Sequence, residues 1–246
     1  MEQGKKKALM IFLGIGIFIA VISCCVLFKK IKINTFVAEQ YSVQGIDVSH
    51  YQGDIDWEKL ESQGIDFAYI KATEGSSSVD ERFTENWSEA AVTSMKIGAY
   101  HFFSFDSAGE TQAQNFMDAV GVLSGKLLPV VDVEYYGDKE KNPPEREAVI
   151  RELNDMLLEL EREYGVKPMI YTTLTVYSKY LEGEFEDYPL WIRDVYLWPE
   201  ITLKDKWVLW QYSDTSVLSG YQGTEKYIDR NVFAGNSEEL EEITVP

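Results

Sequence analysis

The sequence predicts an α/β fold, most simply a small closed barrel of parallel strands. Short apolar runs alternate with segments of helical period from residue 43 onward, and this alternation is typical of strands joined by helical crossovers. About eight such strands fit into roughly 200 residues without a repeat or low-complexity stretch, so one domain is expected. An open doubly wound sheet is the alternative. It would usually bring a glycine-rich phosphate loop after its first strand, and the stretch GIDVSHYQG has none.

The first 42 residues stand apart from this alternation. Residues 8–28 form an uncharged run of 21, long enough to cross a hydrocarbon layer of ~30 Å as one transmembrane helix. We expect a leader at 1–7, an uncleaved membrane anchor at 8–28, a linker at 29–42 and a folded domain at 43–246. Lysines flank the run on both sides, so positive charge does not fix its orientation. A lipoprotein anchored at Cys24 is the alternative, because VISCC loosely resembles a cleavage box.

The first half of the domain alternates regularly. The helix at 56–64 ends at Gly64, and the next helix is indicated by Phe83, Trp87 and Ala90, which recur at three and four residues. A polar helix then precedes the strand LLPVVDVEYY at 127–136. Strands are expected at 45–51, 67–73 and 97–103, and helices at 56–64, 83–91 and 109–123.

The second half contains more strand than helix. A buried strand at 127–136 is followed by a long helix that starts at Pro143-Pro144 and ends at Gly165. Its apolar face is formed by Val149, Leu153, Met156, Leu157 and Leu160. Four further strands are expected at 168–173, 189–196, 207–213 and 227–233, with one short helical stretch at 174–181. The last third is therefore richer in strands than an ideal eightfold barrel.

Charge and composition exclude several classes of function. The net charge is −18, and residues 41–246 alone carry 17 basic and 39 acidic side chains, or −22, so we expect no nucleic-acid partner. Both cysteines, Cys24 and Cys25, lie in the apolar run, which excludes a thiol nucleophile or cysteine metal site in the domain. With two histidines and no ligand spacing, no metal or other cofactor is predicted.

Two acids interrupt the buried strand LLPVVDVEYY. Burying ionised Asp132 and Glu134 among valines costs several kcal/mol unless they are paired or functional. Because side chains alternate along a strand, both acids share one face, and Val131 and Val133 take the other. In a parallel barrel the acids would point into the mouth at the carboxyl ends of the strands. Other predicted strands carry acids in similar positions: Asp47, Asp194 and Asp229.

A close group of carboxylates suggests glycosidic chemistry. Like charges in a partly dry cleft raise the pKa of at least one member, which leaves a proton donor beside an ionised carboxylate. Grouped aromatic side chains, which can stack on sugar rings, favour a carbohydrate ligand. They are Tyr51, Tyr100, Phe102, Tyr135, Tyr171, Trp191, Trp210 and Tyr212. An inactive barrel that only binds glycans, and an acid cluster that binds Mg²⁺ or Ca²⁺, are the competing interpretations.

The ordered segments GIDVSHYQGDIDW, YIKATEG, GAYHFF, PVVDVEYY, IYTT, LWQYS and IDRNVF resemble the glycoside hydrolase family 25 lysozymes, the N-acetylmuramidases. The resemblance implies a modified TIM-like barrel in which antiparallel strands near the C-terminus close a parallel sheet. It also implies hydrolysis of the β-1,4 bond between N-acetylmuramic acid and N-acetylglucosamine. We therefore expect peptidoglycan glycan strands as the partner, a monomeric domain, and a position outside the cell membrane with the leader inside.

The resemblance also assigns roles to individual residues. Glu134 matches the proton donor, Asp132 its partner, and Asp47 and Asp229 two further acids of the cleft. The residues expected to bind substrate are Tyr51, Tyr100, His101, Tyr171 and Trp210. His50 is expected to form loop hydrogen bonds instead. Asp194 departs from the family pattern, and we expect it to form a surface ion pair with Arg193.

Overall fold

The computed structural model describes residues 15–16, 34–199, 203 and 206–246. The predicted leader and nearly all of the predicted anchor at 8–28 lie outside these described residues. Of the helices within them, none is both long and apolar enough to span a membrane. The anchor therefore stays a prediction.

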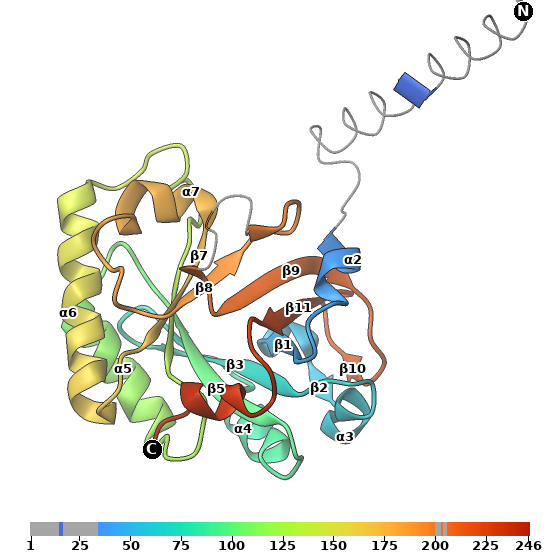
Figure 1. Cartoon of the computed structure of the whole chain (residues 1–246). Coiled ribbons are helices and arrows are strands. Elements are labelled where there is room, and N and C mark those ends of the chain that lie inside the picture. The colour runs from blue at the N-terminus through green and yellow to red at the C-terminus, as the bar shows by residue number, and fades with distance from the viewer. Residues whose placement is uncertain (1–14, 17–33, 200–202, 204–205) are drawn as a thin grey trace, which may run out of the picture.

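Eight strands close into a barrel (Figure 1). Strand β11 runs antiparallel to both of its neighbours, β1 and β9, and the other pairs around the barrel are parallel. The order around the barrel is β1 (Gln44–Val48), β11 (Ile228–Phe233), β9 (Leu209–Ser216), β8 (Leu190–Arg193), β7 (Met169–Thr173), β6 (Val130–Val133), β5 (Lys96–Phe102) and β3 (Phe67–Glu74), which returns to β1. The predicted mixed barrel with an antiparallel closure near the C-terminus is confirmed.

Helices cover the outside of the strands from β3 to β7. They are α3 (Trp57–Glu61), α4 (Phe83–Ala90), α5 (Gly109–Val120), α6 (Arg146–Tyr164) and α7 (Leu174–Val176), the last continued by a π-helical turn at Tyr177–Leu181. Figure 1 shows α5 and α6 side by side on one flank of the barrel. The predicted apolar face of α6 is buried, and Gly165 ends that helix in the left-handed conformation, with φ of 70°. Both predictions for this helix are confirmed.

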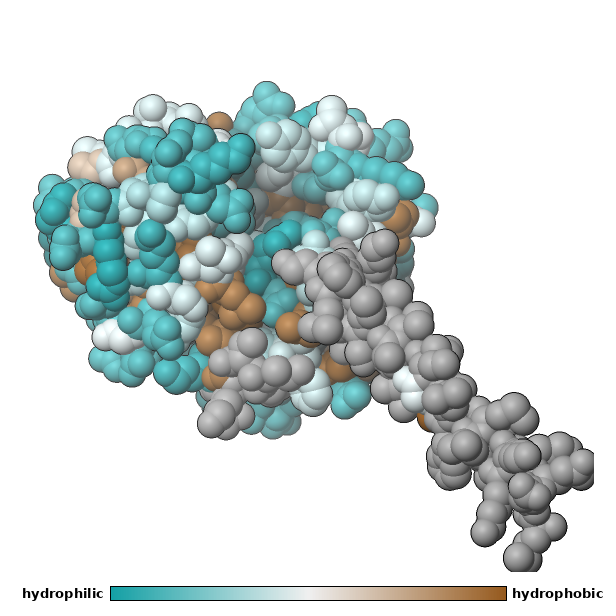
Figure 2. All heavy atoms as spheres, turned by 90° about the horizontal axis from the view of Figure 1, so that it is seen from above, coloured by the Kyte–Doolittle hydropathy of each residue, from teal (hydrophilic) through white to brown (hydrophobic). Residues whose placement is uncertain are grey.

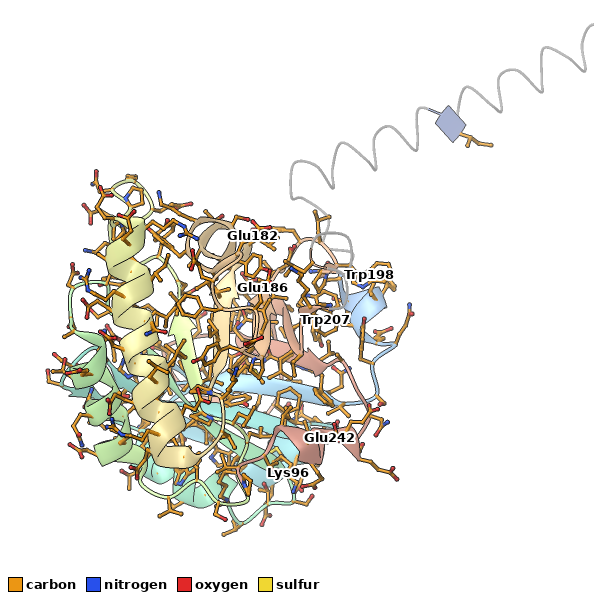
Figure 3. The ribbon with its side chains drawn as sticks, turned by 60° about the vertical axis from the view of Figure 1, so that its left-hand side comes forward. Lys96, Glu182, Glu186, Trp198, Trp207 and Glu242 are labelled. Atoms are coloured by element: carbon orange, nitrogen blue, oxygen red, sulfur yellow. The ribbon has the colours of Figure 1, made fainter. Side chains whose placement is uncertain are left out.

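The opposite flank is covered by residues that were expected to be linker. Helix α2 (Asn34–Ala38) packs against β9, and the fully buried Asn34 anchors it. Its Nδ2 donates to the carbonyl oxygens of Asp194, at 2.7 Å, and Tyr212, at 3.3 Å. Tyr41, just after this helix, has its ring centroid 5.5 Å from that of Trp207, which lies near α2 in Figure 3. The folded domain therefore includes α2, which precedes the first strand. Within the described residues, helix α2 covers β9, a strand that no crossover helix covers.

The strand expected at 45–51 ends at Val48, because Ser49 caps a 3-10 helix at His50–Gln52, so that part of the prediction is wrong. Other short elements at the ends of the barrel were not predicted. They are β2 (Asp54–Ile55) paired with β10 (Tyr221–Gln222), β4 (Ser78–Val79) extending β3, and a second 3-10 helix at Glu239–Ile243. Each is too short to show a hydrophobic period. Hydrophilic residues cover most of the described part of the face seen in Figure 2, as the net charge predicts.

Candidate active site

A cavity of about 380 Å³ lies inside the carboxyl ends of the parallel strands. Its wall includes the four acids that the resemblance assigns to the cleft, Asp47, Asp132, Glu134 and Asp229, but not Asp194. The wall also contains Lys71 and a second group of acids that were not predicted, Asp214 and Glu225. Six acids and six aromatic residues thus line the cavity, with Lys71 as the one cation among the described residues of its wall.

Strand pairing brings the four acids together. Asp47 and Asp229 are direct partners across the antiparallel β1–β11 pair. Asp132 pairs with Tyr171 across β6–β7, and Glu134 follows β6 by one residue. Val131 and Val133 are fully buried, whereas Asp132 and Glu134 line the cavity. The predicted sharing of one face by the two acids is confirmed.

Asp47 is held by a network of buried amides. Its Oδ2 accepts hydrogen bonds from Gln211 Nε2 at 2.9 Å and Asn231 Nδ2 at 2.8 Å. The amide oxygens accept in turn from the Tyr171 hydroxyl and the Trp191 indole N–H, each at 3.0 Å. Burial raises the pKa of Asp47, and the two amide donors oppose this rise by stabilising the ionised form. The network therefore fixes Asp47 in place as an acceptor.

Asp132 has an oxygen without a partner. The residue is 7% exposed, and its buried Oδ1 accepts no hydrogen bond from the described residues. Burial, followed by the charge of Glu134, raises the pKa of Asp132 well above its usual range. A buried carboxylate oxygen left unpaired in this way is costly, and its place in the cavity wall makes it available to a ligand donor.

The other two acids also hold protons more tightly than usual. Burial raises the pKa of Glu134, the nearby Arg193 opposes the rise, and the charge of Asp47 adds to it. Burial and Asp47 together raise the pKa of Asp229 from 3.8 to about 9. Near neutral pH the cluster therefore retains at least one proton beside ionised carboxylates, which is the condition for general acid catalysis.

Three of the five predicted substrate-binding residues line the cavity, namely Tyr51, Tyr100 and Tyr171. The structure does not bring His101 or Trp210 there. The fully buried His101 ring contacts Thr73 Oγ1 at 2.7 Å and Gln112 Oε1 at 3.1 Å, and burial lowers its pKa to about 4.

Trp210 is also fully buried, and its Nε1 donates to the carbonyl oxygen of Asp194 at 2.8 Å. Both errors have the same cause. His101 follows the cavity-lining Tyr100, and Trp210 precedes Gln211, which bonds Asp47. Adjacent residues on a strand face opposite sides, so His101 and Trp210 point outward.

Two smaller predictions have different outcomes. Asp194 is buried rather than exposed, and its Oδ1 accepts the backbone N–H groups of Tyr196 and Leu197. The expected surface ion pair is therefore wrong, since Arg193 bonds Asp214 instead, with 2.8 Å between Nη2 and Oδ2. The loop hydrogen bonding of His50 is confirmed by its contact of 2.7 Å with Asp80.

Comparison with known proteins agrees with this geometry. The model of glycosyl hydrolases family 25 matches residues 46–221. The chain belongs to this family. A family 25 glycosyl hydrolase from Bacillus anthracis is 50% identical, with 84% of this chain and 95% of that one covered and a TM-score of 0.79.

Two Streptomyces proteins are also similar to the enzyme. A bacterial lysozyme from Streptomyces coelicolor is 32% identical, with 82% of this chain and 97% of that one covered and a TM-score of 0.74. Lysozyme M1 of Streptomyces globisporus is 33% identical over 216 residues, which are 82% of this chain and 71% of that protein. The protein is thus a glycoside hydrolase.

Proposed function

We propose that the enzyme is an N-acetylmuramidase that hydrolyses the β-1,4 bond between N-acetylmuramic acid and N-acetylglucosamine in peptidoglycan. The observation that carries this proposal is the convergence of four carboxylates with raised pKa values in one cavity. Family membership and the lysozyme relatives support the substrate class.

Glu134 is the proposed proton donor. Burial raises the pKa of Asp132 well above its usual range and also raises that of Glu134, so the two carboxyls compete for a proton. A substrate N–H that donates to the free Oδ1 of Asp132 would stabilise the ionised form of that carboxylate. The proton would then remain on Glu134, where it can reach the leaving oxygen.

Asp132 is proposed to act on the substrate's 2-acetamido group. It accepts the acetamido N–H while the acetamido oxygen forms a bond to the anomeric carbon and the glycosidic C–O bond breaks. Glu134 gives its proton to the departing oxygen. Water then opens the oxazolinium-like ring and returns a proton to Glu134, with net retention of configuration. Proton NMR of the first product should show the β-anomer, and initial release of the α-anomer would reject this path.

Product analysis tests the activity itself. Purified peptidoglycan is treated with the enzyme, the products are reduced with borohydride, and mass spectrometry identifies the reduced end. Muramitol ends are expected for a muramidase. Glucosaminitol ends would instead show cleavage of the other glycosidic bond, and this would overturn the proposal.

The two rival interpretations predict different results in that assay. A glycan-binding barrel would retain glycan strands and release no product. A metal-dependent site would lose activity with a chelator, although the described residues contain no group of three or more His, Cys, Asp or Glu side chains placed so that they could hold a metal ion. We expect equal product release with and without EDTA.

We also propose that residues 8–28 anchor the enzyme in the membrane with its domain facing the wall. The support is the uncharged run of 21 residues, together with a substrate that lies outside the membrane. Protease added to protoplasts should destroy the domain. A domain that survives until the membrane is opened would contradict this topology, and labelling with a fatty acid at Cys24 would indicate the lipoprotein alternative.

A further inference from the structure

An arginine lies at the rim of the carboxylate cavity. Arg193 is the last residue of β8, two positions after the cavity-lining Trp191 and therefore on the same face of the strand. Its Nη2 lies 2.8 Å from Asp214 Oδ2, and both side chains are about 30% exposed. A guanidinium group keeps its charge at every working pH, so this cation is a permanent feature of the site.

Irregular pairing of β9 places the partner of this arginine. Between β11 and β9, Asn231 pairs with Gln211 and Arg230 with Ser213, so β9 contains an extra residue at this point. Gln211 reaches Asp47 in the cavity, and Asp214, three residues later, also lines it. In a regular strand two residues three apart would face opposite sides, so the bulge brings Asp214 to Arg193.

The charged and titratable groups around Arg193 come from nearly every strand. The acids are Asp47, Asp132, Glu134, Asp214 and Asp229, the tyrosines are Tyr100 and Tyr171, and the second cation is Lys71. Lys71 contacts Glu74 at 2.7 Å, so a carboxylate at the rim offsets part of its charge. Asp214 offsets part of the charge of Arg193 in the same way.

We propose that Arg193, held by Asp214, is a positioning residue that sets how many of the four predicted acids of the cavity are protonated, and thereby the pH range of hydrolysis. This inference rests on the proposed muramidase function. The cation opposes the rise in pKa at Asp47, Asp132, Glu134 and Asp229. Asp214 raises the pKa of Asp229, so it offsets part of the effect of Arg193 at that carboxyl.

The test is the pH dependence of kcat/KM on peptidoglycan for the full chain and two variants. Arg193→Gln removes a cation, so the carboxyls hold protons more tightly and both limbs of the profile move to higher pH, by about one unit. Asp214→Asn removes an anion and releases the charge of Arg193, so both limbs move to lower pH. Arg193→Lys keeps the charge and should keep the wild-type profile to within a few tenths of a unit.

A merely structural pair would give a different pattern. Loss of packing would lower activity at all pH values without moving the limbs, and that result would overturn the inference, as would shifts of both variants in one direction. If thermal unfolding shows that Arg193→Gln is not folded, the pH profiles of Asp214→Asn and Arg193→Lys still test the proposal. Arg162→Gln, which removes an exposed ion pair on α6, is the matched control and should leave the profile unchanged.

The same experiment separates the proposed activity from the role of Arg193 and Asp214. If the wild-type enzyme releases no muramitol ends, the proposed function fails. If it does release them and the variants show unshifted limbs, only the role of Arg193 and Asp214 is rejected.

Discussion

The two flanks of the barrel are built differently, and they contribute different parts of the site. From β3 to β7 the strands are parallel, with one register shift between β3 and β5, and are covered by crossover helices; this flank supplies Asp132 and Glu134. From β8 to β11 one strand runs antiparallel, its pairing with β9 is bulged, and the cover is the short α2. This flank supplies Asp229 and the amides that hold Asp47. The flank from β3 to β7, the regular flank, thus carries the proposed donor. The flank from β8 to β11, the irregular flank, holds the charged groups around it in place.

The largest effect is expected on the regular flank, at the donor. Glu134→Gln keeps the shape of the side chain and removes the transferable proton, so hydrolysis should fall by ~10²–10⁴-fold. The fold should remain intact, because the variant removes one member of a crowded acid cluster. Release of reducing ends and the thermal unfolding midpoint measure the two effects. Glu242→Gln on the exposed surface is the control, and an active, well-folded Glu134→Gln would reject Glu134 as the donor.

Packing of the helical cover should affect stability and not chemistry. Leu157 on α6 is fully buried, and Leu157→Ala should lower the free energy of unfolding by ~2–5 kcal/mol. Its neighbour Leu158 is 50% exposed, so Leu158→Ala is the matched control with a small effect. Denaturant unfolding measures the difference. A reduced kcat in the folded Leu157→Ala enzyme would show that packing of the helical cover also affects the geometry of the site.

The acid cluster on the irregular flank should make stability depend on pH. The pKa of Asp229 is raised from 3.8 in the unfolded chain to about 9 in the fold, so the folded state binds an extra proton between these values. The stabilisation that proton binding by Asp229 gives the folded state is fully present below about pH 4 and is lost as the pH rises toward 9.

Asp229→Asn should therefore unfold at a higher temperature than the wild type at pH 8 and show little difference at pH 4. Thermal unfolding across this pH range is the measurement. Asp187→Asn, at an exposed site, should follow the wild-type curve. A constant gap between the Asp229→Asn and wild-type curves would contradict the assigned pKa.

The smallest effect is expected at α2. Asn34→Ala removes two buried hydrogen bonds to backbone carbonyls, so the free energy of unfolding should fall by about 1–3 kcal/mol. Thr35 is exposed on the same helix, and Thr35→Ala serves as the control. Equal stabilities of these two variants would mean that α2 adds little to the barrel.

The same contrast explains what could be predicted from the sequence. Hydrophobic periods and the stop at Gly165 predicted the helices and parallel strands of the regular flank, and the alternation in VVDVE placed Asp132 and Glu134 on one face. On the other flank the bulges in β9 and the docking of α2 depend on distant contacts, which no local period encodes.

The alternation of side chains along a strand indicates further residues of the site. Asn231 follows Asp229 by two residues, and Arg193 follows Trp191 by two, so both positions are indicated as inward-facing. Family resemblance assigns His101 to the cleft, although its neighbour Tyr100 occupies the inward face of the strand. The position of Asp214 could not be obtained this way, because the bulge changes the alternation before it.

The docking of α2 bears on how the domain can be prepared. The rings of Tyr41 and Trp210 lie 6.3 Å apart, and Trp210 is completely covered. A recombinant protein that starts at the first strand would lack both this tyrosine and Asn34, and would present the indole rings of Trp207 and Trp210 to water. Such a truncation is expected to aggregate, whereas a fragment starting before Asn34 would keep the aromatic cluster sealed and is the better basis for crystallisation.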